Sequence, residues 1–275
     1  MIGETMLLKR WVTGLAILPF LIFFIYKGGA AFAIFVGVAS LLTLGEFYRL
    51  VFSDQPQPVF GILPLTGLFS APVIIWTAHV FTIDLTICVI ILNLMICALF
   101  SLKLYKSDPA IPYRICKQVM GVLYVPLLLA FAIFIRNGTD GAIWIFFVIA
   151  VVFAGDTGAF YAGTYWGKHK LCPGVSPGKT IEGSIGGLGA NILMGSIIKM
   201  AAFPEMIWGE SIFFFLVIGV AGQVGDLFES EFKRSSGIKD SGVIMPGHGG
   251  ILDRIDALLF ALPVAYFFKK YILWV

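Results

Sequence analysis

The sequence contains a series of continuous apolar runs, each long enough to cross a lipid bilayer. A hydrocarbon core about 30 Å thick needs a helix of roughly 17–25 residues, and the chain carries about nine runs of this length. They lie at about 7–26, 29–48, 59–79, 82–102, 117–135, 141–163, 183–203, 210–230 and 251–272. Because the chain is 59% hydrophobic and 13% charged, it cannot cover these runs as a water-soluble globule. We therefore expect an integral membrane protein.

The same runs predict helices rather than strands. Strands of a membrane barrel alternate between polar and apolar residues, whereas these runs are apolar throughout. The first run follows Lys9 and Arg10, but no small-residue cleavage site follows it, so we interpret it as a retained helix and not a signal peptide. The expected fold is all-α and polytopic, with about nine transmembrane helices.

The distribution of Lys and Arg predicts the orientation. With the N-terminus in the cytoplasm, most of the 19 basic residues fall on the inner side, as the positive-inside rule requires. The two most polar loops, 164–182 and 231–250, then both face the cytoplasm. If the first half contained one helix fewer, the N-terminus would lie on the outer side of the membrane, but the two loops would still share one side. The outer side keeps only Lys27, Arg136, Lys199, Lys269 and Lys270.

Charge and glycine divide the chain into two predicted regions. Residues 1–135 form a membrane scaffold of about five helices, and residues 136–275 form a catalytic region of about four helices. In the second region small residues recur four apart, which lets helix backbones approach closely in lipid. These residues are Ala154, Gly158, Ala162, Gly183, Gly187, Ala221 and Gly225.

Carboxylates recur at the predicted cytoplasmic ends of three helices. Asp156 and Asp226 lie near the inner ends of their runs, while Asp253 and Asp256 open the last run on a single face. Charged groups at such depth usually face a cavity, a cation or a partner. Converging carboxylates repel unless a cation neutralises them, and Mg²⁺ is bound by one or two carboxylates together with substrate phosphates. We expect a magnesium site here.

A simpler interpretation stays open for the same residues. Asp253 and Asp256 can act as charge partners of a helix N-terminus, and Asp226 can form an ion pair with Lys233. This alternative leaves Asp156 and Asp240 unexplained.

Basic residues and glycines supply the other half of a phosphate site. Lys233, Arg234 and Lys239 precede a glycine-rich turn that includes Gly249 and Gly250 and leads into the last helix. Backbone N–H groups of such a turn bind anions beside a helix N-terminus. His248 lies in the same turn and either contacts a phosphate, transfers a proton or serves only as a hydrogen-bonding spacer.

The loop at 164–182 repeats this pattern. Ser176, Lys179 and Thr180 stand just before a helix that begins near Glu182, and we interpret them as a second phosphate-facing group. The segment is one residue short of the P-loop spacing and follows no strand, which argues against a P-loop NTPase. Contact with anionic lipid headgroups explains the lysines of this loop equally well.

Residues 230–256 resemble very closely the signature of CDP-diacylglycerol synthases, also called phosphatidate cytidylyltransferases. The segments GDTGAFYAG, GKHKL and SPGKTIEG also resemble motifs of this family, so the resemblance covers about 153–256. The matching positions of the signature are Ser230, Lys233, Arg234, Lys239, Asp240, Gly242, Pro246, His248, Gly249, Gly250, Asp253, Arg254 and Asp256.

The resemblance implies transfer of CMP from CTP to phosphatidic acid, giving CDP-diacylglycerol and pyrophosphate with Mg²⁺ as cofactor. It leaves open whether a second ion, divalent or monovalent, takes part. On this basis Asp226, Asp253 and Asp256 are expected metal ligands, with Asp156 as a further one. We expect Lys233 and His248 to act in catalysis beside these aspartates. The expected phosphate contacts are Ser176, Lys179, Thr180, Lys233, Arg234, Lys239, Asp240, Gly249, Gly250 and Arg254.

The expected partners are CTP, phosphatidic acid and membrane lipid, with no nucleic acid. The resemblance also suggests a homodimer and a place in the bacterial cytoplasmic (inner) membrane, with the active site facing the cytoplasm. A transporter is the alternative of another class, but it predicts polar positions through the full membrane depth and repeated halves. A CDP-alcohol phosphotransferase would need a glycine and an Ala-Arg pair after Asp256, and these are missing.

Overall fold

The fold was examined in a computed structural model, which describes residues 17–53, 59, 61–242 and 249–273. The prediction of an all-α membrane protein is confirmed: among the described residues, seven helices are long and apolar enough to cross a membrane. A shorter apolar helix covers Ile17–Lys27. The long helices are α2 (Gly29–Val51), α3 (Ile62–Val80), α4 (Ile83–Leu104), the continuous segment Ile111–Asn137, α7 (Gly141–Trp166), α8 (Ile181–Ala202) and α9 (Trp208–Ser235).

The remaining elements are shorter or more polar. Segment Ile111–Asn137 consists of α5 (Ile111–Val122), the π-helix η1 (Leu123–Leu127) and α6 (Leu128–Asn137). After α7, strands β1 (Lys170–Cys172) and β2 (Ser176–Thr180) pair antiparallel. Helix α10 (Leu252–Tyr271) completes the fold and carries charges at both ends.

Two details differ from the sequence-based expectation. The helix expected at 117–135 begins at Ile111, because Pro112 occupies its first turn, where a missing N–H costs nothing. The π-helix contains Pro126, which cannot donate the hydrogen bond of a regular helix. The second difference is the β1–β2 hairpin, which lies where the sequence indicated only a polar loop.

The chain divides into two compact units. The first contains Met1–Asn137 and Ser236–Arg254, and the second contains Gly138–Ser235 and Ile255–Val275. We call the segment Ser236–Arg254 the signature loop; its described residues are 236–242 and 249–254. The signature loop packs with the N-terminal helices. The scaffold and catalytic roles of the two regions stay predictions.

At one end of the first unit, an arginine joins two helices. The chain turns between Ile17–Lys27 and α2 through Gly28 and Gly29, which both have positive φ, a conformation that favours glycine. Arg136 donates from Nε to the Ile25 carbonyl at 2.6 Å and from Nη2 to the Tyr26 carbonyl at 2.9 Å. These carbonyls end a helix and need donors. The two hydrogen bonds therefore fix the end of the helix Ile17–Lys27 to α6.

The interior of the first unit contains a closed network of neutral polar groups. The Tyr48 hydroxyl of α2 donates to the Gln118 carbonyl of α5 at 3.0 Å. The Gln118 side chain donates to Asn93 Oδ1 of α4 at 2.9 Å, and Asn93 donates to the Thr66 carbonyl of α3 at 3.1 Å. Four helices are therefore linked by hydrogen bonds from buried polar side chains to one another and to backbone carbonyls.

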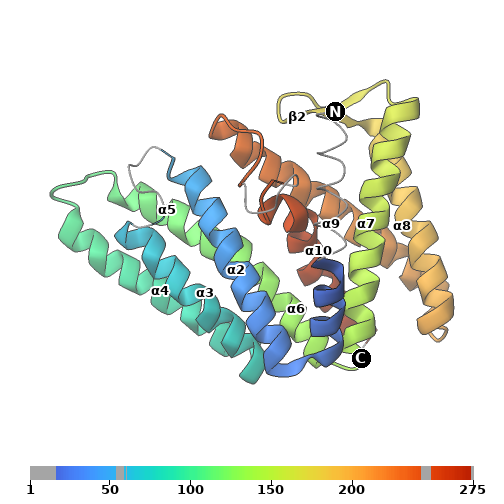
Figure 1. Cartoon of the computed structure of the whole chain (residues 1–275), viewed down its shortest axis with the longest axis horizontal. Helices are drawn as coiled ribbons and strands as arrows, with labels where there is room; N and C mark the ends of the chain where they lie inside the picture. The colour runs from blue at the N-terminus through green and yellow to red at the C-terminus, as the bar shows by residue number, and fades with distance from the viewer. Residues whose placement is uncertain (1–16, 54–58, 60, 243–248, 274–275) are drawn as a thin grey trace. The chain divides into compact units, whose positions relative to one another are not determined.

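In the second unit, glycines bring α7 and α8 into close contact (Figure 1). A Cβ added to Gly158 would overlap the Ala190 side chain, and one added to Gly186 would overlap that of Ala162. A Cβ at Gly183 would lie 2.8 Å from the Ala159 carbonyl. The small-residue faces predicted around Gly158, Ala162 and Gly183 are confirmed, since only small residues permit this distance between the two backbones.

Candidate active site

The β1–β2 hairpin is held at the start of α8 by Glu182. The Glu182 carboxylate accepts hydrogen bonds from Lys168 N at 3.0 Å and His169 N at 3.2 Å, and lies 2.6 Å from His169 Nδ1. Thr180 ends β2 as the N-cap of α8, where its hydroxyl accepts from Gly183 N at 3.1 Å. The hairpin is thereby fixed relative to the helix that follows it.

This hairpin directs Lys179 toward α9. Lys179 Nζ lies 2.6 Å from Asp226 Oδ2, and both side chains are partly exposed. Nearby, Arg234 Nε of α9 donates to the Val175 carbonyl at 3.1 Å. Within the second unit, the 164–182 loop thus contacts the C-terminal part of α9. The pairing of Lys179 with Asp226 was not predicted, because each residue had been assigned to a different ligand.

Three carboxylates gather beside this ion pair. The charge of Asp226 acts on both Asp156 and Asp256, and Asp156 also acts on Asp256. Gly225 permits this arrangement, because a Cβ there would lie 2.5 Å from the Asp256 carbonyl oxygen of α10. We call Asp156, Asp226 and Asp256 the acidic group. Its members come from α7, α9 and α10, three of the elements expected to supply metal ligands.

Lys233 brings a second positive charge to the acidic group. Its ammonium pairs with Glu229 one turn earlier in α9 and also attracts the Asp256 carboxylate. Glu229 is fully buried, so Lys233 is held against the protein by its stem and its partner. The structure pairs Asp226 with Lys179 and Lys233 with Glu229.

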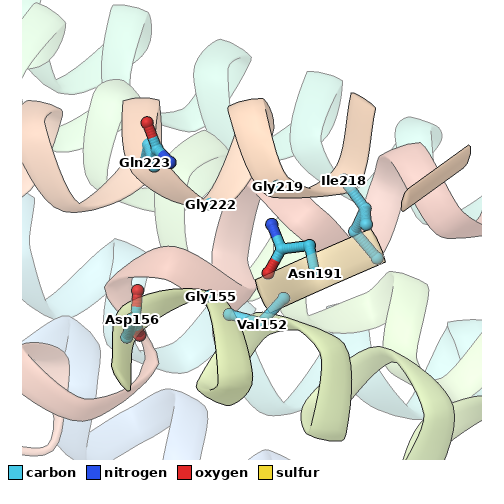
Figure 2. A pocket seen from close by; sticks show the side chains of 8 residues that line it. All are labelled: Val152, Gly155, Asp156, Asn191, Ile218, Gly219, Gly222 and Gln223. Carbon is cyan, nitrogen blue, oxygen red and sulfur yellow. The ribbon is translucent and has the colours of Figure 1, made fainter. Parts of the chain in front are cut away.

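A small cavity among α7, α8 and α9 is lined by Asp156, Asn191 and Gln223 together with apolar residues (Figure 2). The Asn191 side chain of α8 projects between α7 and α9, and a Cβ on Gly155 or Gly219 would overlap its amide. Asn191 is 1% exposed, and its Oδ1 has no hydrogen-bond partner among the described residues. Gln223 lines the same cavity and donates to the Ser184 carbonyl at 3.0 Å. Sequence reasoning missed both amides, although Asn191 stands alone in an apolar run.

The signature loop belongs to the first unit and folds around Asp253. Asp253 Oδ2 accepts from Gly250 N at 2.7 Å and from Ser241 N at 3.0 Å. Gly249 adopts a φ of 81°, which places its backbone in the left-handed region that favours glycine. The aspartate therefore organises the turn that precedes α10, a role compatible with the simpler interpretation.

The other predicted residues of this loop have less defined surroundings. Lys239, Asp240 and Arg254 are exposed, and their phosphate contacts stay predictions. His248 lies outside the described residues. Whether it contacts a phosphate, transfers a proton or serves as a spacer stays open. Ser176 of β2 is partly exposed.

Glu46 is a further residue that sequence reasoning missed. It lies near the end of α2, is 1% exposed, and accepts a hydrogen bond from Leu252 N at 2.9 Å. The Ser241 hydroxyl donates to the same oxygen at 3.5 Å. A single carboxylate near the end of an apolar run was treated as an ordinary helix-end charge. Its isolation within a membrane segment was the signal that could have identified it.

The acidic group is suited to a hard cation, but it is not a complete metal cage. Among the described residues, no three His, Cys, Asp or Glu side chains are placed to hold a metal ion together. Instead, Lys179 and Lys233 supply the positive charge that the carboxylates require. Mg²⁺ commonly uses only one or two carboxylates and completes its shell with water and substrate phosphates. The oxygen donors present fit that mode of binding.

Comparison with known proteins agrees with the signature. The pattern that defines the cytidylyltransferase family matches residues 8–272. A phosphatidate cytidylyltransferase of Staphylococcus haemolyticus is 34% identical over 262 residues, which cover 90% of this chain and 94% of that protein.

Two shorter matches have higher identity. Phosphatidate cytidylyltransferases of Staphylococcus epidermidis and Staphylococcus aureus are 44% and 43% identical over 146 and 150 residues. Each match covers 53% of this chain and 55% of the relative, so the chain spans about half the length of these two relatives in the matched stretch. The resemblance drawn from residues 230–256 is confirmed.

Proposed function

The chain belongs to the cytidylyltransferase family, and we propose that it is a phosphatidate cytidylyltransferase. It transfers CMP from CTP to phosphatidic acid and yields CDP-diacylglycerol and pyrophosphate. The observation that carries the proposal is the 2.6 Å contact between Lys179 and Asp226 beside Asp156 and Asp256. A site for two anionic substrates and a metal ion needs both positive and negative groups, and this contact supports the proposal.

The reaction is an in-line displacement at the α-phosphorus of CTP. A phosphate oxygen of phosphatidic acid forms the new P–O bond, while the bond between the α-phosphorus and its bridging oxygen breaks and pyrophosphate leaves. Both reactants are anions, so positioning and charge compensation supply most of the catalysis. No protein nucleophile is needed.

Lys179, Lys233 and Arg234 hold the phosphates in this scheme. Lys179 and Lys233 already lie against carboxylates, and a substrate phosphate offers them a more highly charged acceptor. If Lys179 turned to the phosphate, the Asp226 carboxylate would be available to hold a metal ion. Without substrate, the Lys179–Asp226 ion pair neutralises the charges of both side chains.

In the second unit, Mg²⁺ would be held by Asp226 and Asp256, with water and substrate phosphates completing its shell. Asp156 and Asp253 stay predicted ligands. When bound, Mg²⁺ screens the two anionic substrates from each other and stabilises the departing pyrophosphate. The mutual repulsion within the acidic group supports this assignment. Asp253 accepts backbone hydrogen bonds from Ser241 and Gly250.

The chemistry belongs at the cytoplasmic face of the bacterial inner membrane. Lys and Arg concentrate on the side that carries both polar loops, and CTP reaches that side from the cytoplasm. Phosphatidic acid is a membrane lipid whose phosphate lies at the depth of the helix ends. The homodimer suggested by the resemblance stays a prediction.

The direct test incubates the detergent-purified protein with CTP labelled at the α-phosphate, phosphatidic acid and Mg²⁺. The label should appear in a CDP-lipid, and neither GTP nor dATP should replace CTP. Chelation with EDTA should stop the transfer. A protein that retains its fold but forms no labelled lipid under these conditions would contradict the proposal.

A further inference from the structure

A buried carboxylate of the N-terminal region lies directly beneath the signature loop. Glu46 is 1% exposed and accepts hydrogen bonds from Leu252 N at 2.9 Å and the Ser241 hydroxyl at 3.5 Å. One turn further along α2, the Leu50 carbonyl accepts from the Ser236 hydroxyl at 2.9 Å. Helix α2 therefore contacts the beginning, the middle and the end of the described loop.

The loop is shaped around this carboxylate. A Cβ on Gly242 would overlap Glu46 Oε1, and a Cβ on Gly250 would lie 2.5 Å from Glu46 Oε2. These two glycines leave room for the carboxylate and no more. Burying a carboxylate is costly unless it gains hydrogen bonds, so a carboxylate retained at this position indicates a specific role.

The contacts of Glu46 lead to Asp253 through shared residues. Ser241 donates its hydroxyl to Glu46 and its backbone N–H to Asp253. Gly250 packs against Glu46 and donates its N–H to Asp253 at 2.7 Å. Displacing Glu46 therefore moves both residues that fix the Asp253 carboxylate.

We propose that Glu46 is a positioning residue that holds the signature loop, and through Ser241 and Gly250 sets the place of Asp253. This inference rests on the proposed function for its catalytic consequence. It also makes α2 part of the catalytic apparatus, although the sequence had indicated a scaffold.

The first test compares Glu46→Gln and Glu46→Ala with a matched variant, Thr43→Val. Thr43 is also fully buried in α2, and its hydroxyl has no hydrogen-bond partner among the described residues. Both Glu46 variants should lower kcat about tenfold or more and raise the Mg²⁺ concentration for half-maximal rate, because supporting residues typically contribute this much. The KM for phosphatidic acid should stay within about twofold of the wild-type value. Thr43→Val should change neither quantity.

A second test needs no catalysis and separates this inference from the proposed function. Trypsin cleavage after the exposed Lys239 reports how firmly the loop is held. Both Glu46 variants should be cleaved at least about tenfold faster than wild-type protein and Thr43→Val, because a released loop opens more often. Equal cleavage rates would overturn the inference whether or not the protein makes a CDP-lipid. Faster cleavage in an inactive wild-type background would instead support it while the proposed function fails.

A third test uses the overlap at Gly242. Gly242→Ala should reduce activity because its methyl group meets Glu46 Oε1. Combining it with Glu46→Asp, which shortens the side chain, should restore at least part of the lost rate. A double variant less active than both single variants would overturn the proposed contact. Since it compares folded proteins, this result holds even if Glu46→Ala fails to fold.

Discussion

The first unit and the second unit use buried polar groups in opposite ways. Around Gln118, neutral side chains bond to one another and to backbone carbonyls across four helices, and the network is closed. Around Asp226, charged side chains from α7, α9 and α10 repel one another and rely on two lysines. A closed neutral network stabilises a fold, whereas a charged group compensated by lysine side chains can exchange these partners for ligands. Glu46 is the exception in the first unit, because its contacts lead to the signature loop.

The largest effect should come from removing a charge of the acidic group. Asp226→Asn should lower kcat about 100-fold or more, since it removes charge where the transition state needs it. The melting temperature should change by no more than about 3 °C, because the loss of the Lys179 pair is offset by reduced repulsion. Turnover assays and thermal melts in detergent check both values. Normal CDP-lipid formation by Asp226→Asn would show that Asp226 is not part of the active site.

Removing the partner lysine should have the next largest effect. Lys179→Ala should lower kcat/KM for CTP roughly 30-fold, which corresponds to about 2 kcal/mol for a lost charged hydrogen bond. Lys170→Ala, in the facing strand of the same hairpin, is the matched control and should stay within about twofold. Equal effects of the two substitutions would show that Lys179 contributes only general positive charge.

Removing a hydrogen-bonding side chain from the neutral network should lower the stability of the fold and leave the catalytic rate unchanged. Gln118→Ala should lower the free energy of unfolding by about 2 kcal/mol, because it leaves Asn93 without its buried donor. The value of kcat per folded molecule should stay constant. A variant with normal stability and a large loss of turnover would contradict the distinction between the two kinds of polar cluster.

The smallest effect should come from the N-cap of α8. Thr180→Ala should cost about 1 kcal/mol of stability through loss of the bond to Gly183 N, and Thr180→Ser should retain most of it. The KM for CTP should change by less than about twofold. If instead that KM rises strongly while the melting temperature stays constant, Thr180 contacts phosphate, as the sequence alone suggested.

The sequence predicted the membrane fold well because the signal is physical and local. Continuous apolar runs are needed to cross a bilayer, and the described helices follow those runs closely. The start of the helix at Ile111 was missed because its first turn is polar and contains Pro112. The hairpin at 170–180 was missed because strands this short carry little pattern of their own.

The sequence predicted that the carboxylates of the acidic group lie at one depth, but it did not predict their ion-pair partners. Asp156, Asp226 and Asp256 could be assigned to one depth from their places in the helices. That Lys179 lies against Asp226 depends on how the hairpin folds onto α9. Glu46 could not be linked to the signature loop from sequence, because about 200 residues separate it from its hydrogen-bond partner Leu252.

The most direct test of the central claim measures Mn²⁺ bound to the purified protein, with Mn²⁺ in place of Mg²⁺, by electron paramagnetic resonance in the presence of CTP. Wild-type protein should take up the ion saturably, and Asp226→Asn should lose most of this binding while retaining its melting temperature. Equal uptake by both proteins would contradict the assignment of the acidic group as the metal site.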